Sequence, residues 1–274
     1  MAKLFFSALF LIFQLLTPPS LLAQNLTLDE LKELANDEDG WAEVTLGHSY
    51  YYGYGVKPDV KLAKYWYEKA AAKGLAAALF GLGQIYYEGR GVEQNFVTAA
   101  AYYKKAVDRD YPDATLALAD MYEQGLGVRR DSKIAKRYYK KAAILYEKEA
   151  QADVGIAQYT LATLYASGVG VDYSPPKASF WFNRAVQSFH DEAVQGSSLA
   201  CSMLALMYEY GDGVEQNVEL AQEWWEMAQE YKQTDTEKEE EQQNATAHDE
   251  TENLPEIHTE NDNQYGQPTK NNLN

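Results

Sequence analysis

The chain has 274 residues, of which 46% are hydrophobic, so it is long enough to bury a sizeable core. Acidic residues outnumber basic ones by 41 to 24, and the resulting net charge of −17 argues against a general affinity for nucleic acid or anionic membranes. Cys201 is the only cysteine, which excludes an intramolecular disulfide, a thiolate zinc cage and a CxxC redox motif.

The N-terminal segment has the pattern of a secretory signal peptide. Lys3 precedes an apolar run from Leu4 to Leu16, and Ala23 follows at a position suited to signal peptidase. We predict that residues 1–23 are a signal peptide. The chain would then be exported, periplasmic or secreted, with no stable membrane insertion after cleavage. An uncleaved anchor is the alternative, although the apolar run is shorter than the about 20 residues of a transmembrane helix.

A short amphipathic helix is predicted next, within residues 24–39. Thr27 and Glu30 have the spacing of a capping box, in which each side chain bonds the backbone N–H of the other residue. The leucines at positions 28, 31 and 34 fall on one side of such a helix. We expect this helix to cap the exposed end of the array that follows.

Five copies of Gly-x-Gly-Val organise most of the remaining chain. Their first glycines are separated by 36, 36, 43 and 43 residues and are Gly53, Gly89, Gly125, Gly168 and Gly211. Each is preceded by alanine at eleven residues, leucine at seven and tyrosine at three, and is followed by alanine at ten and seventeen with an aromatic pair between them. Offsets that advance by four place these residues on one helix face. Each repeat should therefore be a helix, a glycine turn and a second helix.

The repeats also carry helix-start and length signals. A side chain suited to capping the second helix stands six residues after each first glycine, as Asp59, Asn95, Asp131, Ser174 and Asn217. The third and fourth repeats have seven extra residues, which we place around residues 143–154 and 187–196, in longer second helices or their connections. Because one helix pair cannot bury its apolar face alone, the pairs should stack into a solenoid.

We therefore expect one elongated array in place of two domains. The five repeats would span about 40–75, 76–111, 112–154, 155–197 and 198–231. Residues 232–274 contain eleven acidic and three basic side chains with little apolar surface, so we expect a disordered acidic tail. A solvating extension without a partner is favoured over an interaction arm for this tail.

The second repeat shows the full pattern, Ala78-x3-Leu82-Gly83-x2-Tyr86-x2-Gly89-x-Gly91-Val92. This pattern resembles the SEL-like repeat (SLR), a relative of the tetratricopeptide repeat. The resemblance implies an all-α, right-handed α-solenoid that works as an adaptor for partner proteins. In bacteria such adaptors are frequently exported and linked to envelope assembly or host-cell contact. Alanines at positions 119, 162 and 205 replace a glycine that the family often has, which should reduce close helix approach there.

Signals for catalysis or cofactor binding are weak. The glycine turns follow helices and lack the strand and the GKS/T motif of nucleotide-binding loops. Ser174 and Lys177 match the SxxK of penicillin-recognising enzymes, but neither SDN nor KTG occurs, and the cysteine-rich relatives linked to β-lactams carry disulfides that this chain cannot form. We predict no enzyme activity, no cofactor and no metal site. A β-lactam- or cell-wall-directed enzyme or binder is the alternative, and a secreted virulence or host-entry factor is another.

Twelve of the 22 tyrosines lie outside the repeat-defining positions. Five of the twelve lie in or beside the first-helix turns, and with His48 they are our candidate protein-binding residues: Tyr51, Tyr52, Tyr54, Tyr87 and Tyr210. A tyrosine ring contributes a large contact area on binding, and few side-chain torsions lose their freedom. Local packing between repeats is the alternative role for them. We expect His48 to be a surface contact, not a base, and Cys201 to be a small buried apolar side chain.

Overall fold

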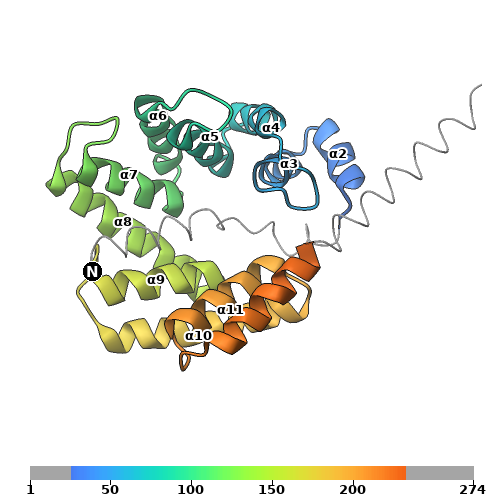
Figure 1. Cartoon of the computed structure of the whole chain (residues 1–274). Helices are drawn as coiled ribbons and strands as arrows, with labels where there is room; N and C mark the ends of the chain where they lie inside the picture. Colours follow the sequence, from blue (N-terminus) through green and yellow to red (C-terminus); the bar gives the residue numbers. More distant parts are fainter. Residues whose placement is uncertain (1–25, 233–274) are drawn as a thin grey trace, which may run out of the picture. The chain divides into compact units, whose positions relative to one another are not determined.

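The computed structural model describes residues 26–232, which are helical apart from short turns (Figure 1). The first helix is α2, Leu28–Asn36. The first helices of the repeats are α3 (Gly40–Tyr52), α5 (Ala76–Glu88), α7 (Pro112–Gln124), α9 (Gly155–Ser167) and α11 (Ser198–Tyr210). The second helices are α4 (Val60–Ala72), α6 (Phe96–Val107), α8 (Ser132–Gln151), α10 (Pro175–Val194) and a helix that begins at residue 218 and reaches residue 232. The predicted signal peptide and acidic tail lie outside the described residues, except for residue 232.

The glycine turn has the same construction in all five repeats. Each first helix ends at the first glycine of its motif, which has φ between 70° and 78° in the left-handed region. The backbone N–H of the residue six positions later then donates to the carbonyl of the repeat tyrosine, at 2.8–3.0 Å. The turn is therefore closed by the backbone on both sides of the glycines.

Side-chain caps form at four of the five predicted positions. Asp59, Asn95, Asp131 and Asn217 each accept a hydrogen bond from a backbone N–H in the first turn of the second helix. Ser174 stands at the N-cap position of α10, but its side chain makes no capping hydrogen bond, so that prediction was wrong. Prolines occupy the first two positions of α10, and they remove N–H groups that a cap would bond.

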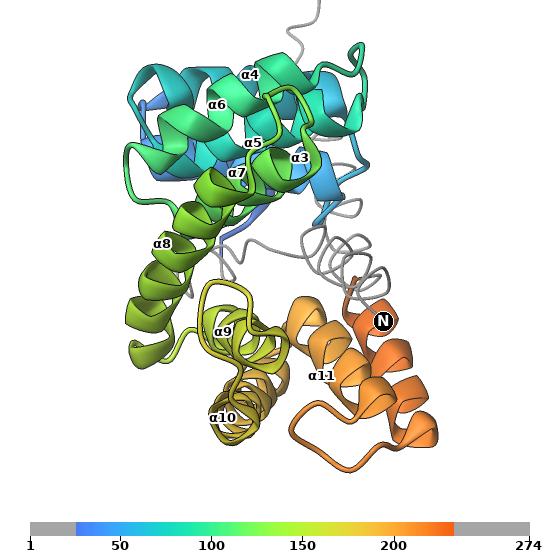
Figure 2. The ribbon, with the colours of Figure 1, turned by 90° about the vertical axis from the view of Figure 1, so that its left-hand side faces the viewer.

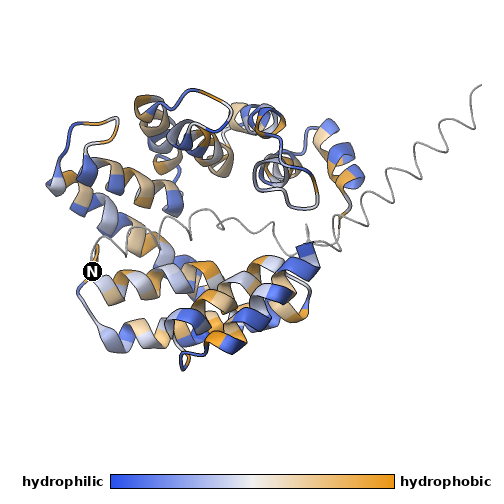
Figure 3. Cartoon of the chain, in the orientation of Figure 1, coloured by the Kyte–Doolittle hydropathy of each residue, from blue (hydrophilic) through white to orange (hydrophobic). Residues whose placement is uncertain are grey.

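The repeat alanines and leucines form the core. The alanines eleven residues before each glycine are at most 1% exposed, and the leucines seven residues before it are at most 2% exposed. Each helix from α2 to α11 packs on the next along the chain, and α3 also touches α5. Figure 3 shows hydrophilic and hydrophobic residues interleaved along these helices. The predicted all-α repeat solenoid is confirmed, and Cys201 is fully buried as expected.

The short helix α2 covers the start of the first repeat. The capping box between Thr27 and Glu30 is present. Leu28 and Leu31 are buried in one cluster with Leu46 of α3 and Trp66 of α4. The helix therefore closes the exposed side of the first helix pair, as a cap of a repeat array must.

The seven extra residues lengthen two second helices. Helices α8 and α10 have 20 residues each, whereas α4 has 13 and α6 has 12. Figure 2 shows the long α8 from the side. In repeats two to five, the second glycine of the turn lies so close to the preceding repeat's second helix that an added Cβ atom would collide with it or crowd it. The contacted residue lies on the second helix of the preceding repeat. It stands seven residues after that repeat's first glycine when the second helix is short, and fourteen residues after it when the second helix is long. The pairs are Gly91 with Val60, Gly127 with Phe96, Gly170 with Tyr139 and Gly213 with Phe182.

Candidate protein-interaction surface

Buried polar side chains of residues 26–232 lie on the first helices. They are Glu43, Thr45, His48, Ser49, Gln84, Asp113, Thr115, Gln158, Thr160 and Thr163. The second helices bury alanines and aromatic rings at their repeat positions. Buried polar side chains are thus concentrated on α3, α5, α7 and α9, and three of the five candidate tyrosines lie on α3 and α5.

Three tyrosines gather where α3 ends. The ring centroid of Tyr52 lies 4.8 Å from that of Tyr51, edge to face, and 5.5 Å from that of Tyr54. The Tyr52 hydroxyl donates to Oε1 of Gln84 on α5, at 3.1 Å. Burial raises the pKa of Tyr54 to about 12, so its hydroxyl stays protonated at neutral pH. We call Tyr51, Tyr52, Tyr54, Gln84 and Arg90 the Tyr52 cluster; it spans the junction of repeats one and two.

Tyr51 is a buried member of this cluster and contributes almost no exposed surface. Its side chain is 1% exposed, and the Arg90 guanidinium lies 4.3 Å above the ring centroid. Arg90 also donates to the Tyr51 carbonyl at 3.2 Å. Burial and the nearby Glu88 carboxylate raise the pKa of Tyr51. The expectation of a surface role for Tyr51 is therefore corrected: the ring is covered by the second repeat and supports its neighbours.

His48 is also buried, so the predicted surface contact was wrong. It is 5% exposed, and its ring lies 5.4 Å from that of Tyr67, edge to face. Its Nε2 atom has no hydrogen-bond partner among the described residues. Desolvation lowers the pKa of His48 to about 3, so the imidazole is neutral at pH 7. The physical reason is that α3 packs against α2, α4 and α5, which leaves little of it uncovered.

The two remaining candidate tyrosines have separate surroundings. Tyr87 is half-buried, with its ring 5.3 Å from Phe96 and 6.4 Å from Tyr103. Tyr210 is 60% exposed at the end of α11, in the fifth repeat. Ring contacts therefore define a three-tyrosine group in the first repeat, which Tyr87 and Tyr210 do not extend.

Sequence reasoning missed Gln84 and Arg90. Arg90 stands between the two glycines of the second repeat, and Asp212 has the same place in the fifth. Asp212 accepts a hydrogen bond from the Tyr159 hydroxyl of the preceding repeat at 2.8 Å. The residue between the glycines thus reaches back to the preceding first helix in both repeats. Aligning the five turns would have singled out this position.

Two carboxyl groups in the third repeat, of which Asp113 is buried and Asp120 half-buried, are bound by tyrosine hydroxyls. Asp113 accepts from Tyr146 and Asp120 accepts from Tyr139, each at 2.5 Å. Burial raises the pKa of each carboxyl to about 6, which their tyrosine hydrogen bonds partly oppose. Among residues 26–232 no three His, Cys, Asp or Glu side chains are placed to hold a metal ion.

The SxxK residues do not meet at a reactive centre. Ser174 opens α10, while the Lys177 ammonium lies 4.8 Å from the centroid of the Tyr165 ring. The Lys177 ammonium is thus directed to an aromatic face, where a cation is attracted to the ring electrons.

The Sel1 repeat model matches the chain five times, at residues 42–75, 76–111, 112–145, 155–188 and 198–228. The chain belongs to the Sel1 repeat family. Sel1 repeat proteins generally mediate protein–protein interactions, and the Sel1 fold is typically a non-catalytic scaffold. In the helices described for this Sel1 repeat protein, none combines the length and apolarity needed to cross a bilayer.

Several solved structures are similar to this chain. One is a protective antigen of uropathogenic Escherichia coli with an SLR fold, at 26% identity, covering 75% of this chain and 49% of the antigen, with a TM-score of 0.41. A Sel1 repeat protein from Oxalobacter formigenes has 27% identity, coverage of 74% and 79%, and a TM-score of 0.38. A sel1 repeat protein from Klebsiella pneumoniae subsp. pneumoniae has 21% identity, coverage of 79% and 99%, and a TM-score of 0.46. The chain spans about half the length of the antigen. A comparison with curated proteins finds no match.

Proposed function

We propose that this Sel1 repeat protein is an exported, non-enzymatic scaffold that binds another protein through the Tyr52 cluster. The observation that carries the proposal is the placement of Tyr52 and Tyr54. Both rings are half-buried, lie outside the repeat-defining positions and are held by ring contacts and by the bond to Gln84. Aromatic side chains that are already fixed lose little freedom on binding, which favours their use as anchors.

Arg90 adds a charged group to the same surface. Its side chain is 40% exposed, and its guanidinium lies 3.9 Å from the Glu88 carboxylate. Tyrosine and arginine are, with tryptophan, the residue types enriched among strong contributors to protein interfaces. The Tyr52 cluster therefore offers a partner both an apolar ring surface and a positive hydrogen-bond donor.

The binding test uses a photo-reactive amino acid in place of Tyr54, introduced in cells of the native source. Tyr173 serves as the matched control, because it is 68% exposed beside the glycine turn of the fourth repeat. We expect a crosslinked partner protein from position 54 and none from position 173. Equal yields of the same partner from both positions would contradict a site at the Tyr52 cluster.

Purified partner then measures the contribution of the rings. We expect Tyr52→Ser with Tyr54→Ser to weaken binding at least tenfold while the far-ultraviolet circular dichroism is unchanged. Tyr173→Ser should bind like the natural protein. Tyr51 is left in place because its ring belongs to the core. Unchanged affinity of the double variant would overturn the proposed site.

Export is supported by the signal-peptide pattern of residues 1–23. Cell fractionation tests it: the processed chain should appear in a periplasmic extract or in the culture medium. Recovery in the medium favours the host-contact version of the proposal, and recovery in the membrane pellet favours an uncleaved anchor. A cytoplasmic chain that keeps residues 1–23 would refute export. Covalent labelling of Ser174 by a fluorescent penicillin would refute the non-enzymatic assignment.

A further inference from the structure

Helix α8 presents a positive face on a protein whose net charge is −17. Its 20 residues include six lysines or arginines and two glutamates. Lys133, Lys136, Arg137 and Lys140 are all exposed, and their spacing of i, i+3, i+4 and i+7 puts them on one side of the helix. We call these four residues the basic face.

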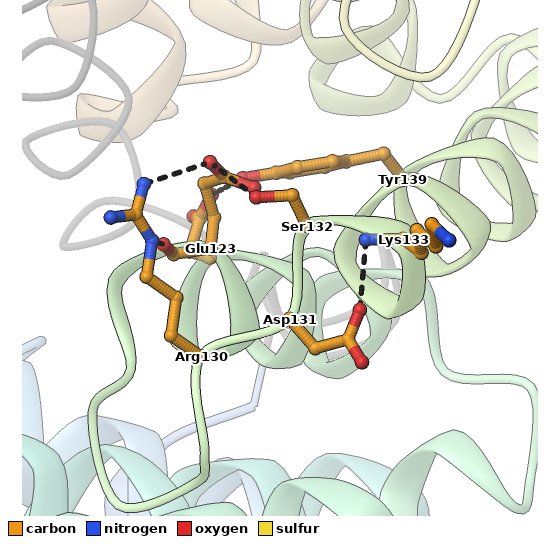
Figure 4. Close-up of polar contacts among 7 residues, drawn as sticks. Glu123, Arg130, Asp131, Ser132, Lys133 and Tyr139 are labelled. Atoms are coloured by element: carbon orange, nitrogen blue, oxygen red, sulfur yellow. Dashed lines mark hydrogen bonds and ion pairs between the residues drawn. The ribbon is translucent and has the colours of Figure 1, made fainter.

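The charges of the basic face are not neutralised by carboxylates within the described chain. None of its four side chains makes an ion pair with a residue from 26 to 232, whereas the adjacent Lys141 is paired with Asp110 at 2.6 Å. Figure 4 shows Arg130, just before the helix, turned toward Glu123, with a 3.6 Å ion pair. Lys133 contacts Asp131 through its backbone N–H only, and its side chain extends away from Asp131 (Figure 4).

The last described helix carries the opposite charge. Glu219, Glu223 and Glu226 are exposed and follow each other at i, i+4 and i+7, so they too share one side of a helix. Glu226 accepts a hydrogen bond from Gln222 at 3.1 Å, which keeps its carboxylate on this side. We call these three glutamates the acidic face. Both faces extend over two helical turns.

The two faces have matching spacings when the helices run antiparallel. From Lys133 the basic face advances by three residues to Lys136 and by four to Lys140, and from Glu226 the acidic face runs back by three residues to Glu223 and by four to Glu219. An antiparallel pairing therefore sets Lys133, Lys136 and Lys140 opposite Glu226, Glu223 and Glu219.

We infer that the basic face of α8 binds the acidic face of the terminal repeat in a second copy of this chain, with the helices antiparallel. The occupant is a second copy because the complementary charge pattern is found on the chain itself. Exposed ion pairs contribute little individually, and two chains of charge −17 repel each other. The association is consequently weak and depends on protein concentration. It uses two different surfaces, so it closes as a reciprocal dimer or grows head to tail.

The test follows the mass of the full chain by analytical ultracentrifugation as its concentration rises. We expect the average mass to increase, and the increase to vanish in Lys133→Glu/Lys136→Glu/Arg137→Glu and in Glu219→Lys/Glu223→Lys/Glu226→Lys. An equimolar mixture of the two variants should associate again, because each then supplies the face that complements the other. At least tenfold weaker association of each variant alone is the expected size of the effect.

A charge-matched control separates local pairing from net charge. Lys57→Glu/Lys61→Glu/Lys104→Glu reverses three exposed cations elsewhere and changes the net charge equally. It should associate like the natural chain. Zero-length carbodiimide crosslinking of mixed unlabelled and ¹⁵N-labelled natural chains should also join Lys140 to Glu219 between copies. A monomer at every concentration, undiminished association of either reversed variant, or failure of the mixture to associate would each overturn the inference.

Discussion

At the scale of single residues, burial sets the protonation state of several side chains on the first helices. Desolvation raises the pKa of Asp113 and of Asp120 to about 6 and lowers that of His48 to about 3. An acid with a raised pKa and a base with a lowered pKa are both held toward their neutral forms. The stability of the protein should therefore depend on pH through these groups.

Replacing Asp113 with asparagine should stabilise the protein above pH 6. The pKa of this carboxyl is about 6 in the folded protein and 3.8 for the free side chain, so the folded state binds the proton more tightly. Folded stability thus falls as the pH rises from about 4 to about 6, by roughly 2–3 kcal/mol. Asparagine can still accept from Tyr146 but carries no charge. Thermal unfolding at pH 8 and pH 4.5 should show a gain for Asp113→Asn that shrinks in acid; a variant less stable at pH 8 refutes this.

Replacing His48 with glutamine should protect the protein in acid. The unfolded chain takes up a proton on His48 near pH 6.5, while the folded protein resists until about pH 3. The natural chain therefore loses stability as the pH falls below 6.5, and the variant lacks that loss. Glutamine already stands at the matching position of the second repeat, Gln84. Urea unfolding at pH 7.5 and pH 5 measures the effect, and equal acid losses in both proteins would contradict it.

The repeat register predicted the buried alanines, leucines and glycine turns but not these polar details. His48 and Tyr51 occupy positions where the residue type differs from repeat to repeat. Their burial depends on the Tyr67 ring of α4 and on Arg90, which a pattern within one helix does not contain. Two of the candidate residues, His48 and Tyr51, are consequently buried where a surface position was expected.

At the scale of helix pairs, the glycine after the repeat leucine allows an aromatic ring of the second helix to be deeply buried against the first helix. Added Cβ atoms at Gly47 and Gly83 would lie 2.4 Å from the rings of Tyr67 and Tyr103. Those rings are 0% and 2% exposed, whereas Tyr139, which faces a repeat with alanine at this place, is 9% exposed. The smaller residue thus lets the two helices and the ring approach closely.

Gly83→Ala should therefore destabilise the protein although alanine is the better helix former. The overlap with Tyr103 forces a shift that costs about 1–3 kcal/mol, against a helix-propensity gain of about 1 kcal/mol. The same change in a Tyr103→Leu background should cost less, because the clashing ring is gone. A double-mutant cycle by urea unfolding measures the coupling. Additive effects would exclude the ring as the cause.

The links between repeats contain a left-handed residue that the sequence did not reveal. The residue fifteen positions before each first glycine has positive φ in all five cases, namely Glu38, Gly74, Asp110, Asp153 and Gly196. Three of the five are not glycine, so no motif marks the position. Asp110 and Asp153 instead form ion pairs with Lys141 and Arg184 of the following second helix.

Asp110→Val should lower the melting temperature, whereas Asp110→Gly should leave it nearly unchanged. At φ 55° a β-branched side chain collides with its own backbone, while glycine adopts this conformation freely and offsets the lost ion pair. Asp108→Val is the matched control, because Asp108 has φ −67° in the same link. Equal losses for the two valine variants, measured by calorimetry, would argue against backbone strain.

At the scale of the whole molecule, each repeat is stabilised by its immediate neighbours. The buried residues divide into clusters that follow the chain, and α2 contributes Leu28 and Leu31 to the first of them. A solenoid of this kind can lose structure at one end while the other end stays folded. The N-terminal end therefore depends on α2.

Leu31→Asp should unfold the first repeat selectively. A buried charge in the contact between α2 and α3 costs several kcal/mol, on the order of 3. Hydrogen exchange should accelerate in α3 and α4 and stay near natural rates in α9 to α11. Leu62→Asp is the control, since Leu62 is 41% exposed on α4. Uniform acceleration along the chain would show that the array unfolds as one unit.

The longer α8 and α10 have a consequence for how repeats can be exchanged. Seven added residues advance a helix by nearly two whole turns, leaving its buried side rotated by only about 20°. Five added residues would rotate it by about 140° and turn the core alanines to solvent. Repeats of 36 and 43 residues can thus be combined in one array. They differ in where along the second helix the next repeat packs. Chimeric arrays assembled from both lengths should fold, and the order of lengths would set the spacing between the side chains that successive turns present.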